Sequence, residues 1–234
     1  MTLNERTKSI LAAAVKEHIK TGEPVSSKEL VKNYDFGVKA ATVRNELNAL
    51  TKGGFLMQPH TSGGRIPTDK GYQFFVESTY DDLLDSRKLI AGNKYQTLAK
   101  TLRRGDVRNF IDAFSKETKL LGVGQGSGEV YKTGLNDLFS NLDVETKEEM
   151  CEIINDFELL DRRLASLKHK FADLTGAPRV YIGKDSPITQ SKNLSVIMDS
   201  FEVNGEPFLV AIIGPKRMHY DKYLQLMQAF HEQE

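Results

Sequence analysis

Apolar residues in the first fifty positions recur at the spacing of short amphipathic helices, and this pattern constrains the start of the chain more than any other feature. The first segment, residues 4–20, stops at Gly22, and the third spans residues 40–51. Between them a segment opens at Ser26, which stands before Glu29 at the spacing of a capping box. Short helices of this kind must bury their apolar faces against one another, so the pattern predicts a small helical unit.

A predicted hairpin follows the third helix. Residues 55–58 favour a short strand, residues 59–64 a loop with glycines at its tip, and residues 65–67 a returning strand, after which Thr68 begins another helix. Three helices followed by a hairpin in this order are typical of DNA-binding domains that place one helix in the major groove. We therefore expect residues 1–76 to form a winged helix-turn-helix DNA-binding domain.

The remainder of the chain changes character. Apolar spacing predicts helices across residues 77–118, which we interpret as a helical linker region, whereas residues 119–234 alternate strand and helix patterns. A glycine-rich turn at residues 124–128 joins two strands, and Asn204-Gly205 favours a tight hairpin between two later ones. The whole chain is therefore expected to be an α+β protein. The strands and the long helix predicted after the linker are 120–123, 129–132, 146–174, 179–183, 194–203 and 207–213.

Composition narrows the possible classes of function. Hydrophobic residues make up 39% and charged residues 27% of the 234 residues, which is ordinary for a soluble globular protein. No apolar run reaches the roughly 18 residues of a membrane span, the N-terminus lacks a signal-peptide pattern, and the single Cys151 belongs to no zinc pattern. We therefore expect a cytoplasmic protein with no metal or cofactor. We also expect no enzymatic site, because no catalytic signature accompanies its serines and histidines.

Charge is sorted along the chain although the formal net charge is zero. Residues 1–80 hold 11 Lys and Arg against 8 Asp and Glu, and residues 87–108 hold seven basic residues and one acid. Residues 137–161 hold nine acids and one base. Such sorting can steer a polyanion toward one end of a protein. Solvated helix faces are the simpler interpretation of the charge pattern alone.

The predicted helix at residues 40–51 has a polar outward side. Val43, Leu47 and Leu50 lie inward, and the outward residues include arginine, asparagine and threonine. Arginine can donate to guanine edges, asparagine can pair with adenine, and threonine can contact a thymine methyl group. The alternative is that this is only the wet side of an amphipathic helix. With phosphate-contacting residues added, the predicted DNA-binding set is Ser26, Ser27, Lys39, Thr42, Arg44, Asn45, Asn48, His60, Thr61, Ser62 and Arg65.

Three runs resemble the hallmarks of the heat-inducible transcription repressor HrcA family: TGEPVSS at residues 21–27, ATVRNE at 41–46 and QPHTSGGRIPTDKGY at 58–72. The resemblance covers residues 4–76 closely and resumes at residues 180–183 and 214–220. It implies a repressor of chaperone (heat-shock) genes that binds an inverted-repeat operator in double-stranded DNA as a homodimer. It also implies dependence on a GroEL-type chaperonin, loss of activity on heating, and a GAF-like sensing and dimerisation domain over residues 119–234.

The chain departs from that family pattern in length and at single positions. It is much shorter, and neither the family's inserted dimerising domain nor much of the first half of the GAF-like domain can be placed between residues 80 and 120. We therefore expect a reduced GAF-like α/β domain. Lys39 stands where a helix-capping serine is usual, and His219 stands where an aspartate is usual. These departures leave the mode of dimerisation and any ligand pocket open.

The long helix predicted at residues 146–174 offers a candidate dimer seam. Its apolar residues step by three and four, the heptad period that favours paired helices. The alternative is that the helix covers the sheet formed by the strands after Pro178, and the two roles could coexist in different halves of the helix. The predicted dimerisation residues are Phe157, Leu160, Leu164, Leu167 and Phe171.

Two functions of other classes stay compatible with the sequence. The winged helix could bind a protein as an assembly adaptor, and the GAF-like half could sense a small molecule. The glycine run at residues 122–128 lacks the glycine spacing of a dinucleotide loop and the lysine of a phosphate loop, so we interpret it as a flexible hairpin turn. His18 continues the apolar stripe of the first helix, which predicts a place at the edge of the core.

Overall fold

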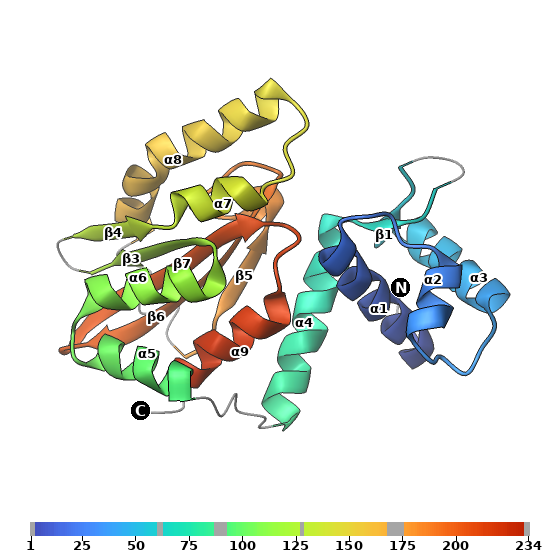
Figure 1. The fold of residues 1–234 in the computed structure, drawn as a ribbon, viewed down its shortest axis with the longest axis horizontal. Coiled ribbons are helices and arrows are strands. Elements are labelled where there is room, and N and C mark those ends of the chain that lie inside the picture. The colour runs from blue at the N-terminus through green and yellow to red at the C-terminus, as the bar shows by residue number, and fades with distance from the viewer. Residues whose placement is uncertain (1–2, 60–62, 87–92, 127–128, 168–175, 232–234) are drawn as a thin grey trace. The chain divides into compact units, whose positions relative to one another are not determined.

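The structure is a computed structural model that describes residues 3–59, 63–86, 93–126, 129–167 and 176–231 (Figure 1). The protein is α+β, as predicted, and it divides into two compact units. Unit 1 comprises Met1–Asp81 and unit 2 comprises Asp82–Glu234. Residues 82–118, most of the region that the sequence predicts as a helical linker, are grouped with unit 2.

Unit 1 consists of helices and one short hairpin. The first helix begins where the Asn4 side chain accepts a hydrogen bond from the Thr7 N–H at 2.9 Å, and it ends where Gly22 takes up a left-handed φ of 75°. The next helix opens with the predicted capping box between Ser26 and Glu29. The elements are α1 (Glu5–Thr21), α2 (Ser27–Asn33), α3 (Ala40–Lys52), β1 (Leu56–Met57), β2 (Ile66–Pro67) and α4 (Asp69–Ser86), which runs into unit 2.

The predicted hairpin and the predicted core of unit 1 are both present. β1 pairs antiparallel with β2 through Leu56↔Pro67 and Met57↔Ile66, and the strands are shorter than predicted. Thr68 accepts a hydrogen bond from the Gly71 N–H at 3.2 Å and so caps α4. His18 is buried with its Nδ1 2.9 Å from the Glu23 carbonyl oxygen, at the core edge as expected. The fully buried residues of the helices include Ile10, Leu11, Leu30, Val43 and Leu50.

Unit 2 is built on a five-stranded sheet in which all neighbouring strands are antiparallel, in the order β4-β3-β7-β6-β5. The two central strands, β6 and β7, are joined at Asn204 and Gly205, both with positive φ, so the predicted tight hairpin is confirmed. The strands are β3 (Leu121–Gln125), β4 (Val130–Thr133), β5 (Arg179–Ile182), β6 (Leu194–Val203) and β7 (Glu206–Pro215).

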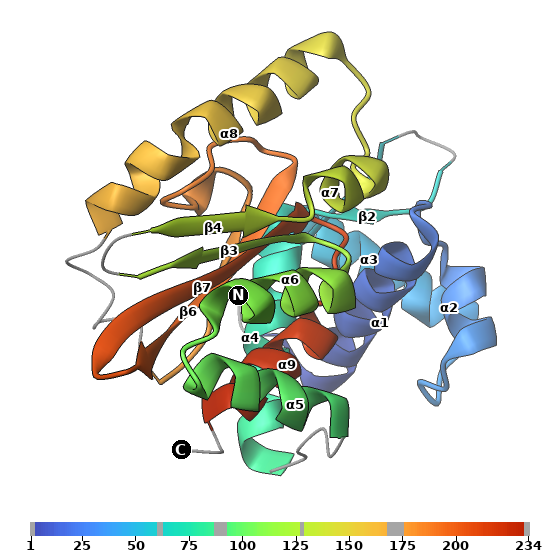
Figure 2. The same ribbon diagram turned by 60° about the vertical axis from the view of Figure 1, so that its left-hand side comes forward.

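Helices cover both faces of this sheet, so unit 2 has three layers (Figure 2). One face carries α7 (Leu135–Asn141), which was not predicted, and α8 (Lys147–Leu167). The other face carries α5 (Asn93–Arg103), α6 (Val107–Thr118) and α9 (Tyr220–His231). A short 3₁₀ turn, η3 (Gly183–Asp185), follows β5.

Aromatic packing explains why the segment expected to be a linker belongs to unit 2. The ring of Phe230 in α9 lies 5.3 Å from that of Phe110 and 5.8 Å from that of Phe114, both in α6. All three side chains are buried. Aromatic side chains of this size contribute large apolar areas to a core. Helix α6 is therefore held in the core of unit 2 by α9.

The described part of α8 packs against the sheet, which is the alternative to the predicted dimer seam. Leu160, Leu164 and Leu167 are at most 8% exposed and lie in one core cluster with β3, β6 and β7. Phe157 is partly buried and packs against the same cluster, while Phe171 lies outside the described residues. The helix uses its apolar stripe to cover the sheet, because an uncovered face would expose apolar side chains to water. Its heptad spacing therefore serves the core of the chain.

The glycine run before β4 joins two antiparallel strands, as expected of a hairpin, but the first strand reaches further into it than predicted. Gly122 and Gly124 lie in β3, and residues 127–128 fall outside the described part of the chain. A Cβ atom at Gly124 would lie 2.7 Å from Cγ1 of Ile111 and 2.7 Å from Cζ of Phe208. The glycine therefore allows α6 to approach the sheet closely.

A buried carboxylate fixes the loop between β5 and β6. Asp156 in α8 is 1% exposed and accepts hydrogen bonds from the backbone N–H groups of Gln190 and Ser191 at 2.7 to 2.9 Å. Arg163 Nη1 lies 2.5 Å from the same carboxylate and 3.0 Å from the Ile188 carbonyl oxygen. Asp156, one of the acids in residues 137–161, thus ties the loop to α8. Its carboxylate has the charged partner and the hydrogen bonds that a buried charge needs.

Replacing Leu164 with alanine should lower the free energy of unfolding by about 3 kcal/mol, because it leaves a cavity between α8 and the sheet. Ile154→Ala on the same helix is the matched control, since Ile154 is 45% exposed, and its effect should stay below about 0.5 kcal/mol. Urea unfolding followed by circular dichroism measures both. Equal effects of the two substitutions would contradict the sheet-covering role of α8.

Replacing Asp156 with asparagine should destabilise the protein by about 3 kcal/mol, because Arg163 would lose its buried partner and an NH2 group would face a backbone donor. Asp161→Asn is the control, since Asp161 is an exposed partner of Lys132 and exposed ion pairs contribute little. Thermal unfolding of both variants checks this. An Asp156→Asn protein as stable as the control would show that the carboxylate is dispensable.

Candidate nucleic-acid interface

Helix α3 divides its side chains as predicted between the core and the surface. Val43, Leu47 and Leu50 are at most 3% exposed, so they fix which side of the helix faces outward. The outward side carries one guanidinium and two amide side chains, the groups that pair with base edges in a major groove. The residues concerned are Thr42, which is half-buried, and Arg44, Asn45 and Asn48, which are exposed.

The single acid of α3 is turned away from this outward face. Glu46 Oε1 lies 3.1 Å from Arg6 Nη2, and its Oε2 accepts a hydrogen bond from the Thr7 hydroxyl at 2.8 Å. Both partners are in α1, and the Glu46 side chain is 15% exposed. The charges that α3 offers to solvent are therefore the basic ones, Arg44 and Lys52. This arrangement lowers the electrostatic cost of bringing a polyanion to the helix.

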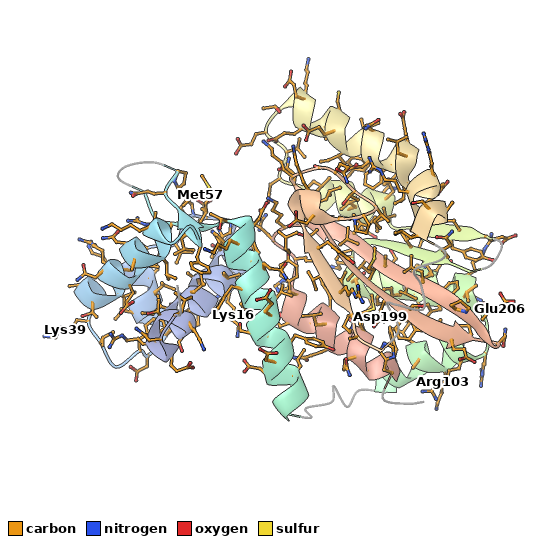
Figure 3. All side chains as sticks on the ribbon, turned by 180° about the vertical axis from the view of Figure 1, so that it is seen from behind. Lys16, Lys39, Met57, Arg103, Asp199 and Glu206 are labelled. Carbon is orange, nitrogen blue, oxygen red and sulfur yellow. The ribbon has the colours of Figure 1, made fainter. Side chains whose placement is uncertain are left out.

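Lys39 precedes α3 and points into solvent. It occupies the N-cap position, and within the described residues its side chain makes no capping hydrogen bond. Figure 3 shows it extending outward from the end of unit 1. Lysine has no acceptor atom for the N–H groups at the start of a helix, so this position gives up capping energy. What it offers instead is a positive charge beside those N–H groups.

The hairpin of unit 1 is docked onto the loop before α2. The backbone N–H and carbonyl of Arg65 pair with those of Val25, both at 2.8 Å. A Cβ atom at Gly64 would lie 2.5 Å from the carbonyl oxygen of Pro24, so this contact requires glycine. Gln58 Nε2 donates to the Gly63 carbonyl at 3.3 Å across the hairpin. The hairpin position is therefore set by its own backbone.

Arg65 turns back from the hairpin onto α3. Its Nε donates to Thr51 Oγ1 at 3.1 Å and its Nη2 donates to Asn48 Oδ1 at 2.6 Å. The sequence analysis named Arg65 and Asn48 separately and missed Thr51. The signal that could have found it is spacing, because residues three apart on a helix lie on one face.

A groove of about 430 Å³ gathers several of the predicted residues. It lies between the start of α2, the outward side of α3 and the hairpin, and its lining includes Ser26, Arg44, Asn48, Gln58 and Arg65.

Four of the predicted contacts are either nearly buried or outside the described residues. Ser27, at the first turn of α2, lines the groove but is only 6% exposed. His60, Thr61 and Ser62 lie outside the described residues. Ser26 lines the groove, but its hydroxyl already accepts the capping hydrogen bond from Glu29 N–H at 3.3 Å.

Fold and site together define a class of two-unit α+β protein, in which a small helical unit presents a basic, amide-bearing helix face and a second unit is built on a helix-covered antiparallel sheet. The family described as HrcA protein C terminal domain matches residues 78–224 of this chain. The chain therefore belongs to the HrcA family.

Relatives of this family carry the name heat-inducible transcription repressor HrcA. The one from Thermodesulfovibrio yellowstonii is 43% identical over 116 residues, which cover 50% of this chain and 33% of that protein. The first relatives are thus matched over about a third of their length. The relative from Natranaerobius thermophilus is 24% identical over 324 positions, covering 97% of this chain and 94% of that protein. Since this chain has 234 residues, much of that relative has no counterpart here, in agreement with the short length noted above.

A solved crystal structure of a hypothetical protein has the same fold. It superimposes with a TM-score of 0.76 at 17% identity, covering 99% of this chain and 97% of that one.

Across the described helices, none combines the length and the apolar character needed to cross a membrane.

Replacing Lys39 with serine should stabilise unit 1 by about 1 kcal/mol, because a hydroxyl can accept a hydrogen bond from the first turn of α3. Lys39→Ala is the matched control, since it removes the charge without supplying an acceptor. Thermal unfolding of the two variants measures the difference. Equal melting temperatures would contradict the cost that Lys39 imposes at this cap.

Proposed function

We propose that this protein is a sequence-specific DNA-binding transcriptional repressor that acts as a negative regulator of heat-shock genes. The observation that carries the proposal is the outward face of α3 in a chain of the HrcA family. Arg44, Asn45 and Asn48 are exposed there, and the one acid of the helix is paired with α1. In this proposal the protein is cytoplasmic, and it binds DNA without acting as an enzyme.

We propose that unit 1 is a winged helix-turn-helix and that unit 2 is a reduced GAF-like domain. Three helices followed by the β1–β2 hairpin, docked through the Val25–Arg65 backbone pair, support the first assignment. The antiparallel sheet with helices on both faces supports the second. In this assignment α3 is the recognition helix and the hairpin is the wing.

The chemistry of recognition follows from the residue types. Arg44 can donate two parallel hydrogen bonds to a guanine edge, and Asn45 can pair with an adenine edge. Thr42 and Lys39, nearer the start of α3, suit phosphate contacts that fix the register of the helix without reading sequence. The positive charge of this end of α3 also releases counterions from DNA, so binding should weaken as salt rises.

The operator that we propose is an inverted repeat bound by a homodimer. An inverted repeat has two-fold symmetry, and a helix-turn-helix protein matches it with two copies of its recognition helix. The described part of the apolar stripe of α8 is buried within the chain, so we propose that the dimer contact lies outside that part. A GroEL-type chaperonin is the partner that we propose for maintaining the active form, as the family resemblance implies.

A binding experiment tests the proposed function directly. Fluorescence anisotropy would compare an inverted-repeat sequence from upstream of chaperone genes with a scrambled duplex of the same composition, at two salt concentrations. We expect operator binding at least about a thousandfold tighter than binding to the scrambled duplex. Equal affinity for both duplexes would refute sequence-specific repression and would favour the protein-adaptor alternative.

Arg44→Ala and Asn45→Ala should each cost about 1–3 kcal/mol of operator binding and much less on scrambled DNA, because base contacts carry the sequence information. Lys20→Ala on α1 is the matched surface control, and it should change both affinities by similar small amounts. The two affinities of each variant are measured at one salt concentration. Losses of the same size on both duplexes would exclude base reading by Arg44 and Asn45.

A further inference from the structure

We infer that Arg65 sets base specificity through Asn48, as a positioning residue of the recognition helix, and that it is not a phosphate contact of the wing. The inference rests on the proposed function, because it concerns how the same DNA-binding face reads a base. The sequence analysis expected Arg65 to contact the DNA phosphates through its charge, and this inference replaces that expectation.

Arg65 is held at three points. Its backbone pairs with Val25, its Nε donates to Thr51 Oγ1, and its Nη2 donates to Asn48 Oδ1. Thr51 in turn donates its hydroxyl hydrogen to the Leu47 carbonyl at 2.8 Å, which leaves a lone pair of Oγ1 directed at the guanidinium. Two acceptors one helical turn apart therefore match the planar donor fork of an arginine.

The charge on Arg65 also decides which end of the Asn48 amide faces it. A guanidinium has donors and no acceptor, so the atom at 2.6 Å must be the amide oxygen. Hydrogen bonds from a charged donor are stronger than neutral ones, so this contact holds the side chain in one orientation. The NH2 group of Asn48 then points away from the guanidinium.

This orientation changes what Asn48 can read. An asparagine that pairs with adenine accepts from N6 and donates to N7, so it needs its oxygen as well as its NH2 group. The contact with Arg65 uses one lone pair of the oxygen and fixes its direction, so the amide presents its NH2 group as a donor. A donor alone matches O6 of guanine or O4 of thymine, and it also matches N7 of either purine. We therefore expect the position that Asn48 meets to favour one of these acceptors over a bidentate contact with adenine.

The Arg65–Asn48 contact also couples the hairpin to α3. The backbone of Arg65 is fixed where Gly64 packs on Pro24, so the guanidinium arrives at α3 from a docked segment. A side chain that is already ordered in the free protein loses less conformational entropy when the protein binds its partner. A lysine at this position keeps the positive charge but has no fork to reach two acceptors at once, and this difference separates the two roles of Arg65.

The test is Arg65→Lys, assayed on operator and scrambled DNA over a range of salt. We expect the ratio of the two affinities to fall about tenfold while the slope of log affinity against log salt stays the same, because charge is kept and orientation is lost. Arg103→Lys, an exposed arginine of unit 2, is the matched control (Figure 3). An Arg65→Lys protein with the wild-type ratio would overturn the inference, as would Arg65→Ala losing the same factor on both duplexes.

A double-mutant cycle assigns the effect to Asn48. In an Asn48→Ala background, Arg65→Lys should change the affinity ratio no further, because the residue through which it acts is gone. Independent, additive losses would overturn the inference. Thermal unfolding of each variant shows whether unit 1 remains folded. The affinity ratios of the cycle are compared between Arg65→Lys and Asn48→Ala proteins that unfold at the wild-type temperature.

A measurement without DNA separates this inference from the proposed function. In the free protein, the side-chain NH2 resonances of Asn48 should shift in Arg65→Lys and stay unchanged in Arg103→Lys. If the wild-type protein discriminates between duplexes and these resonances do not respond, the inference alone fails. If the wild-type protein does not discriminate at all, the proposed function fails and the inference falls with it.

Discussion

The antiparallel pairing of β6 with β7 is the constraint on which unit 2 depends. Its register runs from Leu194↔Pro215 to Val203↔Glu206, and the side chains of residues 194–201 and 208–215 are buried on both faces. A sheet with two apolar faces must be covered twice. The helices before β3, between β4 and β5, and after β7 supply the two covers. Leu209, Ala211 and Ile213 meet the layer of α7 and α8.

Polar groups inside this stack specify its geometry, because apolar contacts alone are non-directional. Asp199, which is labelled in Figure 3, is fully buried in β6. It lies 2.7 Å from Nε2 of His231 at the end of α9. Tyr223 in α9 donates to the Thr118 carbonyl at 2.8 Å. Burial, followed by the charge of Glu117, raises the pKa of Tyr223 to about 12, so the hydroxyl remains a donor at neutral pH.

The same principle operates on the surface of unit 1. Arg6 and Thr7 hold Glu46 against α1. On the other side, Arg65 holds Asn48 and is itself bound to Thr51. Such contacts contribute modestly to stability when they are exposed. They also shape the outward side of α3, since they remove the acid from it and orient one amide. In the proposed function, this face is prepared by residues that do not themselves have to touch DNA.

The sequence by itself determined the elements whose signals are local. The capping box at Ser26, the left-handed stop at Gly22 and the Asn204-Gly205 hairpin each depend on a few neighbouring residues, and the inward row of α3 follows from its own periodicity. Only the tertiary structure decided what each surface meets. Periodicity shows that α8 has an apolar stripe, but the sheet that takes up Leu164 is distant in sequence. Likewise Arg65 and Asn48 are 17 residues apart, and their contact exists because backbone docking brings the hairpin to α3.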